Sequence, residues 1–408
     1  MLCFILKKAF LALLLSVAAV SALAQSEGLQ YSVSGKVRDA KTGNALQFVN
    51  VLMEGRHYAT ITNSDGGFLI KSDIPIDTLV FSYLGYESRK LPVEATSMTV
   101  YLTPSIFSID PAIVLSAQPR LLVQQAIKRI PDNYSNEEEL LQCFYRETMQ
   151  KRQRYIYVSE AVSKLFKTPY SRGVYRDAAA LVKSRILISS RQRDTLSVKF
   201  LGGPTQAVDF DVVKNLRFLL NQAELGFYNM EMGVPVKIDG RLNLTVQIYP
   251  MVERPYALYF GTFYIDSETY AFSRIELSLD MSDERKATDD ILLRKPAGLR
   301  FHPKELSIVI NYRLDGDRWR ISFFRSLLRF SCDWRKRLFY TNYTSINELV
   351  VTDKYPDAVP IPRAEQFRLR EALSDKAELF TDTDFWKEYN IIEPSVSLEH
   401  AVGRLMKR

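Results

Sequence analysis

The chain has 408 residues, of which 47% are apolar and 25% charged, a globular composition that excludes an intrinsically disordered protein. The formal net charge of +7 is too small to demand a polyanionic partner, although it permits contact with anionic lipid or polysaccharide. This length is enough for two domains. Aromatic residues make up 12%, and because aromatics favour pleated, half-buried surfaces, this excess favours β-sheet.

Residues 1–24 have the organisation of a secretory signal peptide. Lys7 and Lys8 precede an apolar stretch over 9–20, and Ala22 to Ala24 is typical of a signal-peptidase site. The alternative is an uncleaved anchor, but the apolar run is shorter than the ~20 residues that span a bilayer. We therefore expect export to the periplasm or the outer membrane, with no transmembrane span in the mature chain.

Residues 28–103 contain short β-rich runs separated by turns. Asp39 to Gly43 and Asn63 to Gly67 carry the glycine and small polar residues of tight turns. The β-rich run Phe48 to Met53 lies between these two turns, and the run Thr78 to Tyr83 follows the second turn. Several short strands at this spacing predict a β-sandwich.

The blocks at 34–55, 62–70 and 79–93 resemble the carboxypeptidase regulatory-like domain, which is common in Bacteroidetes envelope proteins. They occur in the order and at the spacing of that family. The resemblance implies a seven-stranded sandwich of prealbumin-like type without catalytic residues. It implies an accessory or docking domain, and it indicates location and architecture more than chemistry.

Residues 104–139 are predicted to be a linker followed by a short helix. Pro104, Pro111 and Pro119 punctuate the segment, and apolar residues then recur at helical spacing up to Pro131.

Residues 140–352 show long alternating segments typical of an antiparallel β domain. Hairpins are predicted over 257–280 and over 306–324. We therefore expect a mainly β fold, with a sandwich followed by a larger, curved antiparallel sheet and capping helices.

Four motifs in the body of the chain carry a second resemblance. They are FYRE (144–147), YIYVSEAV (155–162), and the stretches 261–277 and 382–394. With the N-terminal blocks, they are similar to Bacteroidetes carboxypeptidase-like regulatory domain-containing proteins. The hairpin rhythm also resembles the half-barrel of lipoprotein carriers, which implies a sheet curled around helices with an apolar cleft.

Residues 353–408 are predicted to be a helical segment that packs on the β domain. Leu398, Ala401, Val402 and Leu405 follow helical spacing, with Ser397 as an N-cap. The helix either covers the sheet or binds a partner.

The chain lacks the common catalytic signatures, including HExxH, GxSxG and phosphate-binding glycine loops. His302 and Glu305 have the bare spacing of a zinc carboxypeptidase pair, with His400 later, but the flanking residues are typical of a strand. We expect no catalytic residue, no metal and no cofactor. The alternative is a hydrolase whose acidic residues converge in a pocket.

Arg318, Arg320, Arg325 and Arg329 are the candidate contacts to an anionic surface. Alternation places Arg318 and Arg320 on the solvent side of a strand, with Trp319, Ile321 and Phe323 on the other side. Export argues against nucleic acid as the partner.

Cys143 and Cys332 are the cysteines left after cleavage. They form either one disulfide or two buried free thiols.

Taken together, these patterns predict a non-enzymatic envelope protein. Its β domain would bind an amphipathic lipid or glycan ligand, or an outer-membrane or periplasmic protein. The alternative is a structural or interaction module beside an outer-membrane transporter or secretion complex.

Overall fold

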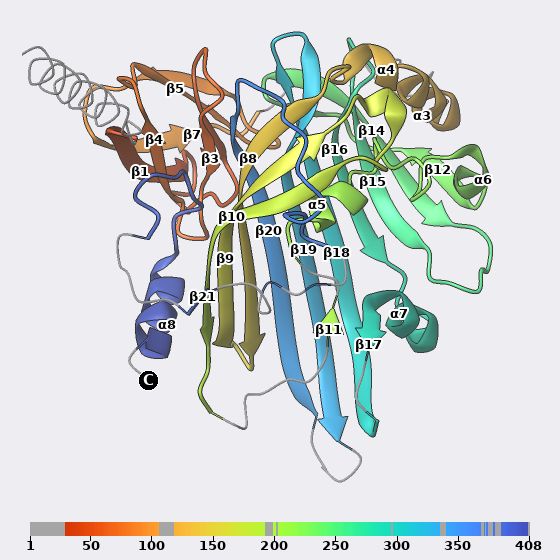
Figure 1. The fold of residues 1–408 in the computed structure, drawn as a ribbon. Helices are drawn as coiled ribbons and strands as arrows, with labels where there is room; N and C mark the ends of the chain where they lie inside the picture. Colours follow the sequence, from red (N-terminus) through yellow and green to blue (C-terminus); the bar gives the residue numbers. More distant parts are fainter. Residues whose placement is uncertain are drawn as a thin grey trace, which may run out of the picture.

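The computed structural model describes residues 29–105, 118–191, 199–200, 203–294, 297–334, 340–368, 371, 373, 378–379 and 385–406. The predicted signal peptide and most of the predicted linker lie outside these residues. Figure 1 shows a small β domain beside one large, strongly twisted sheet.

The N-terminal domain is a seven-stranded sandwich, as predicted. One sheet has the order β4-β1-β7, with β1 and β7 parallel, and the other has the order β3-β2-β5-β6. The strands are β1 (Tyr31–Asp39), β2 (Asn50–Met53), β3 (Ala59–Ile61), β4 (Gly67–Ser72), β5 (Thr78–Ser82), β6 (Arg89–Pro92) and β7 (Ser97–Leu102).

Alternation within the strands builds the sandwich core. In β4, every second side chain is buried, and Phe68 and Ile70 pack against Val37, Leu79 and other apolar residues of the two sheets. The turn before β4 requires glycine at position 66, where φ is +74° and an added Cβ would lie 2.4 Å from the carbonyl oxygen of Val37.

The second domain is built on a 12-stranded sheet with the order β12-β14-β15-β16-β18-β19-β20-β8-β9-β10-β21, in which β13 also pairs with β14. Neighbouring strands of this sheet pair antiparallel, except for β10 with β21, which are parallel. Its strands are β8 (Glu139–Lys151), β9 (Arg154–Lys167), β10 (Ala178–Ile188), β12 (Tyr228–Met232), β13 (Val236–Ile238), β14 (Arg241–Pro250), β15 (Tyr259–Asp266), β16 (Phe272–Leu279), β18 (Leu299–Asp315), β19 (Arg318–Trp334), β20 (Thr341–Lys354) and β21 (Glu378–Leu379). The two predicted hairpins are confirmed as β15–β16 and β18–β19.

The inner face of the large sheet is covered by the segments 118–134 and 203–227 and by α7. Their helices are α3 (Pro119–Lys128), α4 (Ile130–Asn133), α5 (Gln206–Asp209), α6 (Gln222–Leu225) and α7 (Glu284–Ile291). The short helix η1 (Tyr170–Arg172) lies between β9 and β10, and β11 (Lys199–Phe200) pairs with β17 (Leu292–Arg294). Apolar residues of α3, of 207–225 and of ten strands of the sheet form one buried cluster. This face is therefore packed with side chains.

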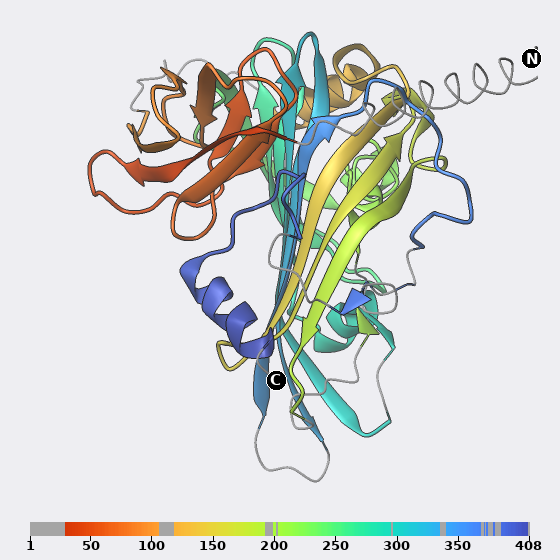
Figure 2. The ribbon, with the colours of Figure 1, turned by 60° about the vertical axis from the view of Figure 1, so that its left-hand side comes forward.

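The outer face carries the sandwich and α8 (Val396–Met406), which Figure 2 shows on the side of the sheet opposite to α7. Phe48 and Ile61 of the sandwich pack against Phe144, Phe323 and other outer-face residues. Leu398 of α8 packs on Val158 and Leu187, so this helix covers the sheet.

Two expectations are corrected by the structure. Within the described residues beyond Lys354, α-helix is confined to α8, because residues 385–395 run as turns and irregular backbone between the sandwich and the sheet and exchange hydrogen bonds with both. Phe323 does not share a face with Trp319 and Ile321, because the register shifts between Asn311 and Tyr312 and turns Phe323 to the outer face.

Candidate functional site

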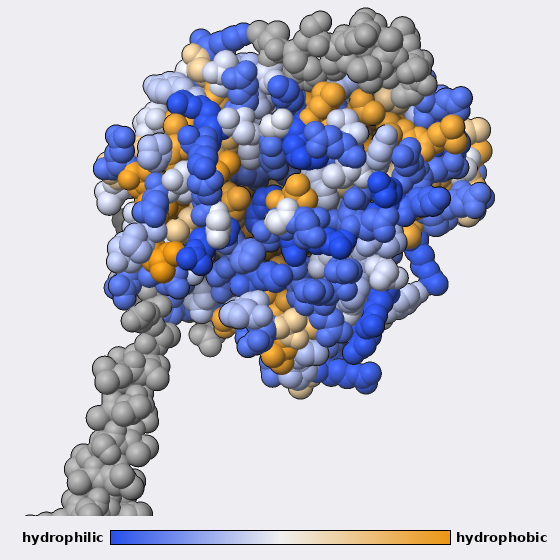
Figure 3. Space-filling view, turned by 90° about the horizontal axis from the view of Figure 1, so that it is seen from above, coloured by the Kyte–Doolittle hydropathy of each residue, from blue (hydrophilic) through white to orange (hydrophobic). Residues whose placement is uncertain are grey.

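Two cavities lie along one side of α3 and share Ile127 in their walls. One has a volume of about 500 Å³ and is lined by α4, η1 and residues 213–217. The other, of about 310 Å³, continues toward α6 and the N-terminal end of α3. We call the two together the α3 groove. Figure 3 views this end of the molecule and shows orange apolar patches interspersed with hydrophilic residues.

The α3 groove has mostly apolar walls and a basic character. Its apolar lining includes Ile130, Val174, Val213, Leu216, Leu220 and Met230. The lining residues of both cavities include Arg120, Lys214 and Arg217 but no acidic residue. Arg217 is exposed, and its guanidinium carbon lies 5.4 Å from the centroid of the Tyr175 ring. The groove therefore offers an apolar channel with a cation at its rim.

A buried cluster of charges fixes the groove to the sheet. Lys167 donates to Asp211 at 2.6 Å, and its ammonium lies 3.4 Å from Asp177. Lys214 donates to Asp177 at 2.7 Å and to the backbone carbonyl of Thr168. We call these four residues the inner charge cluster.

Tyrosines complete this cluster. Tyr170 and Tyr312 donate to the two carboxylate oxygens of Asp211, at 3.1 and 2.8 Å. Burial, together with the charge of Lys167, lowers the pKa of Lys214 to about 8. Because its ammonium donates to Thr168 and Asp177, Lys214 acts as a fixed donor that holds residues 211–214 against the sheet.

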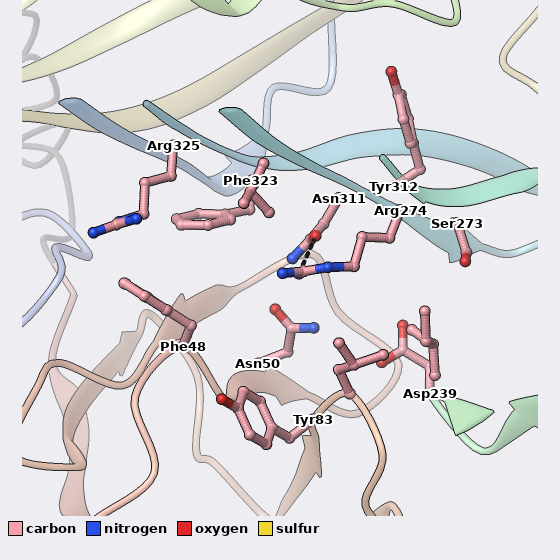
Figure 4. Close-up of a pocket in the computed structure, with 13 residues that line it drawn as sticks. Phe48, Asn50, Tyr83, Asp239, Ser273, Arg274, Asn311, Tyr312, Phe323 and Arg325 are labelled. Atoms are coloured by element: carbon pink, nitrogen blue, oxygen red, sulfur yellow. Dashed lines mark hydrogen bonds between the residues drawn. The ribbon is translucent and has the colours of Figure 1, made fainter. Parts of the chain in front are cut away.

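A third cavity, of about 220 Å³, lies where the sandwich meets the outer face of the large sheet. Figure 4 shows Phe48, Asn50 and Tyr83 facing Arg274, Asn311 and other sheet residues across it. We call it the junction pocket. Arg274 donates to Glu276 and to Asn311, each at 2.7 Å.

A tight hairpin brings Asp239 into the junction pocket. Asp239 and Gly240 link β13 to β14, and both have positive φ, 52° and 77°. Asp-Gly favours such two-residue turns because both residues tolerate the left-handed region. The amide of Gly85 donates to the carbonyl of Lys237 at 3.0 Å, so the hairpin also docks the sandwich.

The motifs FYRE and YIYVSEAV meet on adjacent strands and serve both faces of the sheet. Arg146 donates to Glu160 at 2.7 Å on the outer face, and Arg185 donates to the same carboxylate. Burial alone would raise the pKa of Glu160, but the two guanidinium groups hold it below its usual range. On the inner face, burial raises the pKa of Glu147 to about 7.

The described part of the stretch 382–394, residues 385–394, docks on this outer-face cluster. The Trp386 indole donates to Glu160 at 3.2 Å, and Arg146 donates to the carbonyl of Ile392 at 2.6 Å. The same segment binds the sandwich, where Asn390 exchanges two hydrogen bonds with the Lys71 backbone. Residues 385–396, here called the C-terminal strap, thus join the two domains.

The four predicted arginines do not form one exposed face. Arg320 is 18% exposed and is paired with Glu139 at 2.6 Å, and Arg325 is 20% exposed beneath Phe48. Arg318 donates to the carbonyl of Asp132. Arg329, which is 57% exposed, is paired with Glu305 at 2.9 Å.

The histidine spacing considered for zinc has a structural explanation. His302 faces Glu284, and Glu305 is paired with Arg329. Over the residues that the structure describes, no group of three or more His, Cys, Asp or Glu side chains is placed to hold a metal ion. In the same residues, no helix is long and apolar enough to cross a membrane. Cys143 and Cys332 are buried free thiols.

Sequence reasoning missed the inner charge cluster and the junction pocket. Lys167, Asp177, Asp211 and Lys214 are spread over almost 50 residues without a motif, so only the fold brings them together. The Asp-Gly pair at 239–240 was an available hairpin signal between two β-rich runs.

Comparisons with known proteins identify part of the chain. Residues 33–111 match the model of the CarboxypepD_reg-like domain family. The TonB-dependent receptor SusC of Bacteroides thetaiotaomicron is 32% identical over 106 residues, which are 26% of this chain and 10% of the receptor. The chain thus spans about a tenth of the length of this curated relative.

Solved structures match the chain at low TM-scores. A putative outer membrane lipoprotein-sorting protein domain from Vibrio parahaemolyticus is 13% identical, with a TM-score of 0.24, over 58% of this chain and 90% of that one. The LolA superfamily protein NE2245 from Nitrosomonas europaea is 10% identical, with a TM-score of 0.21, over 61% of this chain and all of that one. A DUF1329 family protein from Desulfovibrio piger is 11% identical, with a TM-score of 0.25, over 61% of this chain and all of that one. At these scores the similarity does not establish a shared fold.

The family match and the seven-stranded sandwich cover the same part of the molecule, so the N-terminal domain of this chain, strands β1 to β7, is a CarboxypepD_reg-like domain.

Proposed function

We propose that this is a non-enzymatic protein of the bacterial envelope whose β domain binds an anionic amphiphile in the α3 groove. The observation that carries the proposal is a cavity of about 500 Å³ with apolar walls, basic lining residues and no acidic lining residue. This volume lies within the usual range for binding sites of drug-sized ligands, about 300–1,000 Å³. The acyl tail would lie along Ile127 and the head group at Arg217.

The location in the envelope rests on other observations. The predicted signal peptide, the CarboxypepD_reg-like domain and the similarity to a TonB-dependent receptor all support it. The sandwich would act as an accessory domain, fixed to the sheet by the C-terminal strap.

Binding of dodecanoate and of dodecanol to the mature protein tests the proposal, because the two share a tail and differ in charge. We expect dodecanoate to bind more tightly, and Leu216→Trp to weaken both ligands at least about tenfold by filling the groove. Leu121→Trp is the matched control, since Leu121 is 56% exposed on α3 and does not line the groove.

Charge reversal separates the head-group contact from the tail contact. Arg217→Glu should weaken dodecanoate and leave dodecanol unchanged, whereas Lys128→Glu, an exposed position on α3 outside the groove, should affect neither. If neither amphiphile binds, the groove is not a ligand site, and the interaction-module alternative gains support.

A further inference from the structure

Ile127 lies at the boundary between the two cavities of the α3 groove. Among the described residues, it alone lines both of them. Gln124 lines only the smaller cavity and Ile130 only the larger one, so these residues follow one another at helical spacing along α3 and into α4. Figure 1 shows α3 between α4 and α6. The order of these residues places Ile127 where the groove passes from one cavity to the other.

The side chain of Ile127 has little freedom to move aside. A β-branched side chain in a helix has one strongly preferred χ1 rotamer. Ile127 is also half-buried and packs against the large apolar cluster of the inner face. The helix itself is anchored, because Arg120 donates to the carbonyls of Leu225 at 3.1 Å and of Tyr228 at 2.7 Å. Ile127 therefore forms a fixed partition in the groove.

The smaller cavity offers a poor continuation for an apolar chain. Its lining includes the polar side chains of Arg120, Gln124 and Gln222, and Gln124 is exposed. Methylene groups that covered these side chains would remove polar atoms from water without giving them hydrogen bonds. A chain that reaches Ile127 thus gains little by passing it.

We propose that Ile127 sets the length of the acyl chain that the α3 groove accepts, an inference that rests on the function proposed above. With its head group at Arg217, the chain runs through the larger cavity, of about 500 Å³, and ends at Ile127. Each methylene buried on this path should raise the affinity about fourfold. Methylenes beyond Ile127 should add little, because they stay outside the larger cavity.

Calorimetric titration of the full mature protein with saturated fatty acid anions tests this inference. The probes run from octanoate to hexadecanoate, each kept below its critical micelle concentration. In the parent protein, Kd should fall about fourfold per methylene up to a limiting chain length and then level off. Ile127→Ala removes the partition, so the limit should move to longer chains and the longest probe should bind at least about tenfold more tightly than it binds the parent.

Two further variants separate the partition from a general effect on α3. Leu121→Ala is the matched control, since Leu121 is exposed on the same helix and lines neither cavity, and it should keep the parent limit. Ile127→Met keeps a large apolar side chain but removes the β-branch, so it should also move the limit to longer chains, by less than Ile127→Ala. Thermal unfolding checks that each variant is folded, and Ile127→Met carries the test if Ile127→Ala is not.

The outcomes distinguish this inference from the function on which it rests. If fatty acids bind the parent without a limiting length, or if the limit is the same in both Ile127 variants as in the parent, the role of Ile127 is overturned and the groove remains the ligand site. If no fatty acid binds, the proposed function itself fails, and the inference fails with it.

Discussion

The large sheet buries one charged cluster on each face, and the two clusters balance their charges differently. On the outer face, Glu160 lies between Arg146 and Arg185. On the inner face, Lys167 and Lys214 face two carboxylates, Asp177 and Asp211. In the outer cluster two cations share the carboxylate of Glu160, whereas the inner cluster brings two cations together with two acids.

The clusters also differ in what they hold. The outer cluster holds the C-terminal strap through Trp386 and the carbonyl of Ile392, and through the strap it holds the sandwich. The inner cluster holds residues 211–214, which form one wall of the α3 groove. Loss of the outer cluster should therefore loosen the domain arrangement, and loss of the inner cluster should loosen the ligand site.

The largest effect is expected for Glu160→Gln. This change leaves the buried guanidinium of Arg146 without its carboxylate and removes one carboxylate from the half-buried Arg185, which should lower the free energy of unfolding by about 3–5 kcal/mol. Urea denaturation measures the loss, and faster proteolysis within residues 385–396 would report release of the strap. The exposed pair gives the control, since Glu305→Gln should cost less than about 1 kcal/mol. Equal losses in the two variants would contradict the role of the outer cluster.

A smaller loss, about 2–3 kcal/mol, is expected for Asp211→Asn, because Asp177 stays within reach of both lysines. The amide also keeps partners for Tyr170 and Tyr312. The same denaturation series gives the comparison with Glu160→Gln. A loss larger than that of Glu160→Gln would show that the number of acids does not decide the difference between the clusters.

Glu147, on the inner face, should make stability depend on pH. Its pKa is raised to about 7 by burial, from 4.5, so the unfolded chain releases this proton before the folded chain does. The contribution of Glu147 to the free energy of unfolding is fully present below pH 4.5 and is lost between about pH 4.5 and 7. Above about pH 7 this contribution no longer changes with pH. Glu147→Gln should remove this fall and raise the free energy of unfolding at pH 8 by about 3 kcal/mol.

Unfolding curves at pH 5 and pH 8 measure this effect. Glu137→Gln, at an exposed position before β8, serves as the control and should leave the pH dependence of the parent protein intact. A Glu147→Gln variant with an unchanged difference between the two pH values would refute the assignment.

The smallest effect is expected for reduction. Cys143 and Cys332 are buried free thiols in separate apolar clusters of the second domain, so dithiothreitol should leave the melting temperature unchanged. A fall of several degrees on reduction would indicate a disulfide, which typically contributes about 2–4 kcal/mol.

The sequence by itself was enough for the sandwich, the two long hairpins and the mainly β class. These features depend on alternation and on turn residues such as Asn63 to Gly67, which act over a few neighbours along the chain. The motifs FYRE and YIYVSEAV could also be found in the sequence. Alternation along the strand explains why the Arg146 side chain lies on the outer face of the sheet and the Glu147 side chain on the inner face.

Only the tertiary structure decided which distant residues meet. Lys167 reaches Asp211, and Trp386 reaches Glu160 across 226 positions, because strand order and the path of the strap bring them together. Alternation along β19 predicted that its arginines face solvent, yet the sandwich covers Arg325. A register shift also moves Phe323 to the outer face. Alternation fixes the two faces of a strand, but what packs on each face depends on the rest of the chain.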